Sequence, residues 1–99
     1  MIHDIKIRVK VFLLFFFKFL LGVFKLLKFS NRLKQLRKEK NLKQSDMAEL
    51  LELTTRHYQQ IEYGKVNIPT LTLIFLADYF DVSLDYLVGR TDNPNSHKS

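Results

Sequence analysis

The stretch that decides the fold is TTRHYQQIEYGK, residues 54–65. Thr54 is a favoured residue for capping the start of a helix, and Gly64 is the type that most often ends one. Tyr58 and Ile61 are three residues apart, so they share one face, which we expect to point inward. The remaining side chains leave a polar face that is nearly free of acid. The stretch therefore predicts a helix over residues 55–63 that presents amide and guanidinium groups outward.

Two helices are expected before this stretch. Ser30 is a plausible N-cap for the first, and Asn41 suits a left-handed helix end. The second covers residues 44–51. Apolar residues recur at helical spacing in both, which predicts one buried face on each. The residues expected on these faces are Phe29, Leu33, Leu36, Met47, Ala48 and Leu51.

Two helices are expected after it. One covers residues 69–80 with Pro69 in its first turn, and a short one covers residues 84–88 with Ser83 as its N-cap. The core stripe of the longer helix is Leu73, Leu76, Ala77 and Phe80. A second apolar stripe on another side consists of Leu71, Phe75 and Tyr79.

Three blocks of sequence together resemble the Xre family of phage-repressor-like helix-turn-helix regulators. They are QSDMA (residues 44–48), the stretch 54–65 and LADYFDVSLDYL (residues 76–87), and the resemblance covers about 65 residues. It implies an all-α fold: a compact five-helix, lambda-repressor-like DNA-binding domain. It also implies a homodimer on a palindromic operator in double-stranded DNA, with the helix 55–63 in the major groove.

The resemblance also assigns roles to individual residues. The positions that match base-reading residues are Thr55, Arg56 and Gln60, with Gln59 as a further candidate. The positions that match contacts to the DNA backbone are Gln44, Thr54, Tyr63 and Lys65. Arg37 and Glu62 match an ion pair that holds the first helix against the third.

Two residues depart from the family pattern. Lys43 stands where the family often has a Thr or Ser N-cap, so this cap should be missing. Glu52 stands where the turn often has Gly, and a positive φ there would cost about 1 kcal/mol.

Composition excludes several other classes of protein. The chain has 99 residues and no cysteine, so disulfides and thiolate metal sites are excluded. Its three histidines are far apart, which gives no metal-ligand spacing, and we expect no metal and no cofactor. No nucleophile with a base and no phosphate-binding loop is evident, so we do not expect an enzyme. A core of this size leaves little room for a pocket.

The chain divides into an apolar, lysine-containing N-terminal segment (1–29) that we expect to be helical, the helix-turn-helix domain (30–88), and a tail (89–99) that we expect to be disordered. Residues 1–30 carry net charge +5 of the total +6, so the basic pI is not itself an argument for nucleic acid. Residues 6–29 allow a membrane-spanning helix, a signal peptide, or a basic helix on an anionic membrane surface. Packing against protein, and an extension without selected function, also stay open.

Three functions follow from these features. The first is a sequence-specific repressor in the cytoplasm, which the N-terminal segment could associate with the membrane. The second is an antitoxin-type or other protein-interaction module, and the third is a membrane peptide fused to a vestigial domain. The stripe formed by Leu71, Phe75 and Tyr79 is a dimer contact, a docking face for the N-terminal helix, or a set of scattered exposed residues.

Overall fold

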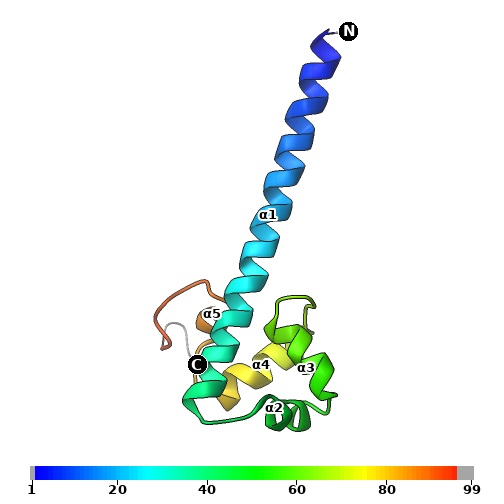
Figure 1. Ribbon diagram of the computed structural model, residues 1–99. Helices are drawn as coiled ribbons and strands as arrows, with labels where there is room; N and C mark the ends of the chain where they lie inside the picture. Colours follow the sequence, from blue (N-terminus) through cyan, green and yellow to red (C-terminus); the bar gives the residue numbers. More distant parts are fainter. Residues whose placement is uncertain (1, 96–99) are drawn as a thin grey trace.

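The computed structural model describes residues 2–95, and every element in this part of the chain is a helix. The helices are α1 (Ile2–Glu39), α2 (Gln44–Leu50), α3 (Thr55–Glu62), α4 (Thr70–Tyr79) and α5 (Leu84–Leu87). Figure 1 shows α2 to α5 gathered around the C-terminal third of α1. The predicted all-α, five-helix domain is confirmed. The bounds of α2, α3 and α5 differ from the expected ones by one residue at the C-terminal end, and those of α4 by one residue at each end.

The start of the first helix was wrongly predicted. Ser30 does not cap a helix, because α1 runs without a break from Ile2 to Glu39. No proline interrupts residues 1–29, and the many Leu and Lys residues favour helix, so the chain has no reason to leave it before Ser30. Ser30 is instead buried, and its hydroxyl lies 2.9 Å from the carbonyl oxygens of both Leu26 and Ile61.

The core lies where α1, α2, α3 and α4 meet. All the inward residues expected on α1 and α3 are buried, together with Met47 and Ala48 of α2. The small side chain of Ala48 permits close approach, and α2 packs mainly against α3. The other buried apolar residues are Leu76, Ala77, Phe80, Val82 and Leu87, while Leu51 and Leu73 are partly buried at the edge.

The turns explain how the short helices end. Asn41 has φ 57° and ends α1 in the left-handed conformation that asparagine tolerates. Glu52 has φ 56°, a conformation that strains the backbone of a residue with a side chain and that the glycine common in the family would adopt without strain. Lys43 supplies no side-chain cap to α2, as expected, but its backbone N–H donates to Asp46 Oδ2 (2.7 Å). Half of a capping box therefore remains at the start of α2.

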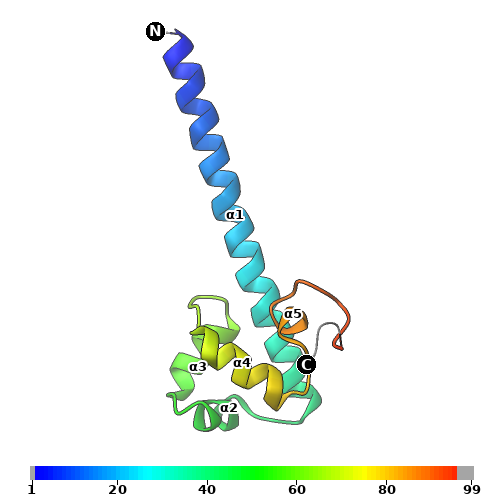
Figure 2. The same cartoon turned by 180° about the vertical axis from the view of Figure 1, so that it is seen from behind.

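The N-terminal part of α1 projects away from the other helices, as both views show (Figures 1 and 2). From Ile5 to Leu27 nearly all of its large apolar side chains are exposed. Among helices of the described residues, none combines the length and hydropathy needed to cross a membrane, since lysines recur too closely along α1.

Residues 89–95 of the expected tail make several hydrogen bonds to the helical domain. The Arg32 guanidinium donates to the carbonyl oxygens of Tyr86 (3.0 Å) and Thr91 (2.9 Å) and pairs with Asp92 (3.2 Å). The Ser83 N–H donates to the carbonyl oxygen of Pro94 (2.8 Å). Composition alone could not show that Arg32 supplies partners for this polar segment. Residues 96–99 of the predicted tail lie outside the described part of the chain.

Candidate nucleic-acid interface

The helix α3 is held at both ends by the residues that the sequence singles out. Thr54 precedes it in extended conformation, and its Oγ1 accepts a hydrogen bond from the His57 N–H (3.1 Å). At the other end Gly64 has φ 72°. A Cβ there would also meet Leu27 Cδ2 at 2.8 Å, so a larger residue would have to displace this side chain of α1. The helix is therefore short, sharply bounded and fixed in direction.

The outward face of α3 carries the predicted base-reading side chains. Thr55 and Arg56 are exposed, while Gln59 and Gln60 are half-buried. Among the predicted backbone contacts, Thr54, Lys65 and Tyr63 are exposed, the last at 57%. His57 is exposed as well. The inward face consists of Tyr58, Ile61 and Glu62.

The structure brings Arg37 of α1 and Glu62 of α3 together in a bidentate ion pair. Arg37 Nε donates to Glu62 Oε2 (2.6 Å), and Nη2 donates to Oε1 (3.2 Å). The remaining Nη1 donates to the carbonyl oxygen of Leu42 (2.8 Å). Arg37 is 8% exposed and Glu62 is 4% exposed. Such a pair is shielded from water and ties α3 to the last turns of α1.

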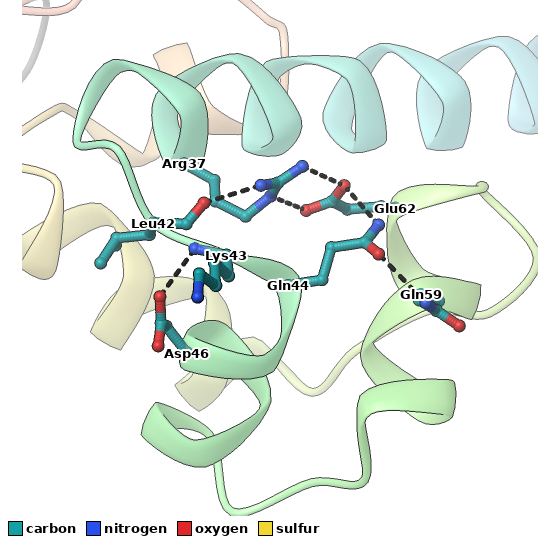
Figure 3. Close-up of polar contacts among 7 residues, drawn as sticks. All are labelled: Arg37, Leu42, Lys43, Gln44, Asp46, Gln59 and Glu62. Carbon is teal, nitrogen blue, oxygen red and sulfur yellow. Dashed lines mark hydrogen bonds and ion pairs between the residues drawn. The ribbon is translucent and has the colours of Figure 1, made fainter.

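Two glutamines extend this ion pair toward the outward face of α3 (Figure 3). Gln44 Nε2 donates to Glu62 Oε1 (3.2 Å), and Gln44 Oε1 accepts from Gln59 Nε2 (3.1 Å). Sequence reasoning placed Gln44 and Gln59 at DNA contacts and missed the bond between them. The sequence shows that both residues carry amide groups able to bond to each other. It does not show that they do, because the packing of α2 on α3 decides which partner each amide meets.

The electrostatics of the pair follow from its burial. Burial disfavours the Glu62 carboxylate, but the hydrogen bonds from Arg37 and Gln44 outweigh it and lower the pKa of Glu62. The hydrogen bond to Glu62 raises the pKa of Arg37 further above its already high value. Burial also raises the pKa of the Tyr58 phenol, which stays protonated. The pair is thus fully ionised at neutral pH.

The second apolar stripe of α4 is only partly free. Leu71 is 80% exposed and Phe75 is 44% exposed. Tyr79 is half-buried, since its ring stacks on Phe75 and lies under the Lys40 ammonium, 4.6 Å from the ring centroid. Leu71 and Phe75 also border a shallow groove whose other wall is Leu50, Leu51 and Glu52.

Comparison with known proteins gives consistent matches. A helix-turn-helix family model matches residues 33–87. The uncharacterized HTH-type transcriptional regulator YqaE of Bacillus subtilis is 42% identical over 65 residues, 66% of this chain and 56% of the relative. The uncharacterized HTH-type transcriptional regulator YobD of the same organism is 36% identical over 67 residues, 68% of this chain and 60% of the relative.

The alignments thus cover less than two thirds of the length of either relative. No solved structure matches the chain.

Proposed function

Because the chain belongs to the helix-turn-helix family of the Xre, phage-repressor-like type, we propose that it binds double-stranded DNA sequence-specifically and represses transcription. In this proposal α3 lies in the major groove. A repressor of this kind acts where the chromosome is, in the cytoplasm.

The observation that carries the proposal is the outward face of α3. This helix is capped at both ends, and an ion pair that is almost entirely buried ties it to α1. Arg56 suits guanine and Gln60 suits adenine, each through two hydrogen bonds, while the Thr55 methyl group suits thymine. Gln59 still has a carbonyl oxygen that can accept from a base amino group. A rigid helix with these groups can discriminate between base pairs.

The backbone contacts in this proposal surround α3. Thr54 and Tyr63 would contact phosphates or sugars with their hydroxyls, and Lys65 with its ammonium. Gln44 would do so with its second amide hydrogen, because the first is donated to Glu62. Such contacts set the register on the duplex and carry no sequence information directly.

Selection of bound sequences from a random duplex pool, followed by two variants, tests the proposal. Arg56→Ala should lose about 1–3 kcal/mol of discrimination at one base pair. Lys65→Ala should weaken binding to all sequences about equally and reduce the salt slope by about 1. Glu49→Ala, on α2, is a control on the charged surface. If Arg56→Ala ranks all sequences as the parent does, the base-reading role of α3 is wrong.

The apolar patch of α4 supports a homodimer on a palindromic site. In this proposal Leu71 and Phe75 of one copy contact the same residues of a second copy. Tyr79 supports the position of Phe75, because the two rings stack within one copy. Phe75→Glu should then give a monomer in analytical ultracentrifugation and weaken binding to a full palindrome more than to a half-site. A parent chain that is monomeric at every concentration would contradict the dimer. A small partner protein that co-purifies in equal amount would favour the protein-interaction alternative.

A second candidate function concerns residues 6–29. The exposed apolar side chains of α1 alternate with basic residues, a combination that suits the surface of an anionic membrane. Co-sedimentation with phosphatidylglycerol vesicles should exceed that with phosphatidylcholine vesicles, and Lys10→Glu/Lys18→Glu should reduce the difference. Equal and weak binding to both vesicle types would exclude this role.

A further inference from the structure

A cavity of about 540 Å³ lies between α1, the loop before α4 and the end of α5. This volume is within the range of about 300–1,000 Å³ that is usual for small-molecule sites. Its apolar wall is formed by Leu26, Phe29, Leu73 and Val88, and its polar rim by Lys25, Lys28, Asn67 and Arg90, with Gly22 and Gly89 between them. This cavity lies outside the core, against α1, so it does not depend on the little room that a core of this size leaves for a pocket.

The rim is cationic. Among the described residues that line the cavity none is acidic, while Lys25, Lys28 and Arg90 are all exposed. Asp85 offsets the Arg90 charge only in part, at 3.8 Å. Three cations on one rim repel one another, so a single anion placed among them would be attracted by all three.

The wall of the cavity suits a hydrocarbon chain. Phe29 is almost fully buried, and Leu26, Leu73 and Val88 are each partly exposed toward the cavity. Gly22 and Gly89 have no side chains that would occupy the cavity. At Gly89 an added Cβ would meet the Lys28 side chain at 2.7 Å, so the glycine lets the lysine stem lie across the cavity edge. At Gly22 an added Cβ would meet nothing within 4 Å.

We propose that this cavity binds one single-chain anionic amphiphile: an acyl chain against Leu26, Leu73 and Val88, with a carboxylate or phosphate head between Lys25, Lys28 and Arg90. The cations hold the head by charge-assisted hydrogen bonds, and burial of the chain supplies the rest of the affinity. A free amphiphile and a bilayer lipid share this chemistry. The proposal commits to the free molecule, because the volume of about 540 Å³ suits a single small ligand.

The site also adjoins the proposed DNA interface. Asn67 on its rim is two residues from Lys65, a proposed backbone contact. A ligand that fixes Asn67 would restrict the loop that carries Lys65, and so change affinity for the operator. This link rests on the proposed function, whereas ligand binding itself does not.

The test uses sodium dodecanoate below its critical micelle concentration as the probe, the full chain and amide NMR. Dodecanoate should saturate at one molecule per chain and shift the amides of Gly22, Asn67 and Gly89 most. Gly22→Leu should abolish these shifts, since the new side chain fills open space, while the helix becomes no less stable. Shifts that spread along residues 5–20 and persist in Gly22→Leu would show mere adsorption to the exposed helix and overturn the proposal.

Variants that remove charge distinguish the contribution of the ligand's anionic head group from that of its acyl chain. Lys25→Gln/Lys28→Gln should weaken dodecanoate binding about tenfold or more but leave dodecanol binding unchanged. The matched control Lys10→Gln/Lys18→Gln removes equal charge from the same helix outside the cavity and should leave both affinities unchanged. Equal losses in the two double variants would overturn the assignment of the head.

Two further experiments distinguish a free amphiphile from a bilayer lipid, and test whether ligand binding changes the affinity for DNA. If phosphatidylglycerol vesicles produce the shifts and dodecanoate does not, the ligand is a bilayer lipid and the proposal as stated fails. If dodecanoate binds and operator affinity stays the same, the link to Lys65 fails while the site stands. Failure to find any operator would instead count against the proposed function alone.

Discussion

The ion pair between Arg37 and Glu62 permits a quantitative test of what holds α3 in place. Replacing either residue by methionine leaves the charge of its partner buried and unpaired, since the side chain of Arg37 is only 9% exposed and that of Glu62 only 1% exposed. Loss of one member of such a pair costs about 3–5 kcal/mol. At about 0.05–0.15 kcal/mol per residue, a domain of some 65 residues has only about 3–10 kcal/mol of stability. Each single variant should therefore lose about a third or more of the stability of the domain.

The double variant Arg37→Met/Glu62→Met should behave differently. It buries no charge, and methionine fills irregular space well, so its free energy of unfolding should lie within about 1 kcal/mol of the parent's or above it. The coupling energy in the double-mutant cycle, which is the sum of the two single losses minus the loss in the double variant, should then be about 5 kcal/mol or more. Urea titrations followed by far-UV circular dichroism measure all four proteins.

An exposed pair on the same protein provides the control. Arg90 lies 3.8 Å from Asp85 and its side chain is 78% exposed, so Arg90→Met should change stability by less than about 1 kcal/mol. If the two single losses at positions 37 and 62 simply add in the double variant, the pair contributes no coupling and the reasoning from burial is wrong.

Three other results are expected. Glu52→Gly should stabilise the protein by up to about 1 kcal/mol in urea titrations, because it relieves a positive φ, whereas Asn41→Gly should be nearly neutral. The pKa of Glu62 is lowered by folding, so the stability it provides should be complete above about pH 5 and decline as acid protonates it; Glu62→Met should lack this part of the decline. Ser30→Ala should cost about 0.5–1.5 kcal/mol, since it removes the buried hydroxyl that lies between α1 and the Ile61 carbonyl; an increase in the melting temperature would contradict this role.

Local chemistry made much of the fold predictable. Thr54 and Gly64 bound α3 because an N-cap hydroxyl and a left-handed glycine act on their immediate neighbours, wherever the rest of the chain lies. Inward residues such as Leu33 and Ile61 followed from helical spacing alone. Even the strain at Glu52 was foreseeable, since the position in the turn demands a positive φ.

The errors arose where a partner distant in sequence decides the outcome. Ser30 has the chemistry of a cap, but its hydroxyl finds the Ile61 carbonyl 31 residues away, and α1 continues through it. Gln59 has the chemistry of a base reader, yet part of its amide is bound to Gln44. The tail has the composition of a disordered segment, but Arg32, 59 residues before Thr91, donates a hydrogen bond to it. Side-chain type alone says which groups can bond, and only the packing of the helices says which do.

The positions of the ties between α1 and α3 have a mechanical consequence. Ser30 and Arg37 are seven residues apart, two turns on one face of α1, and they hold the adjacent residues Ile61 and Glu62. Leu27, a further turn toward the N-terminus, touches the position of Gly64. The C-terminal end of α3 is thus tied to α1 by hydrogen bonds at two points two turns apart, so a tilt of α1 would change the direction of α3. Any molecule that holds the exposed N-terminal part of α1, a membrane surface or a bound amphiphile, would thereby act on the direction of α3.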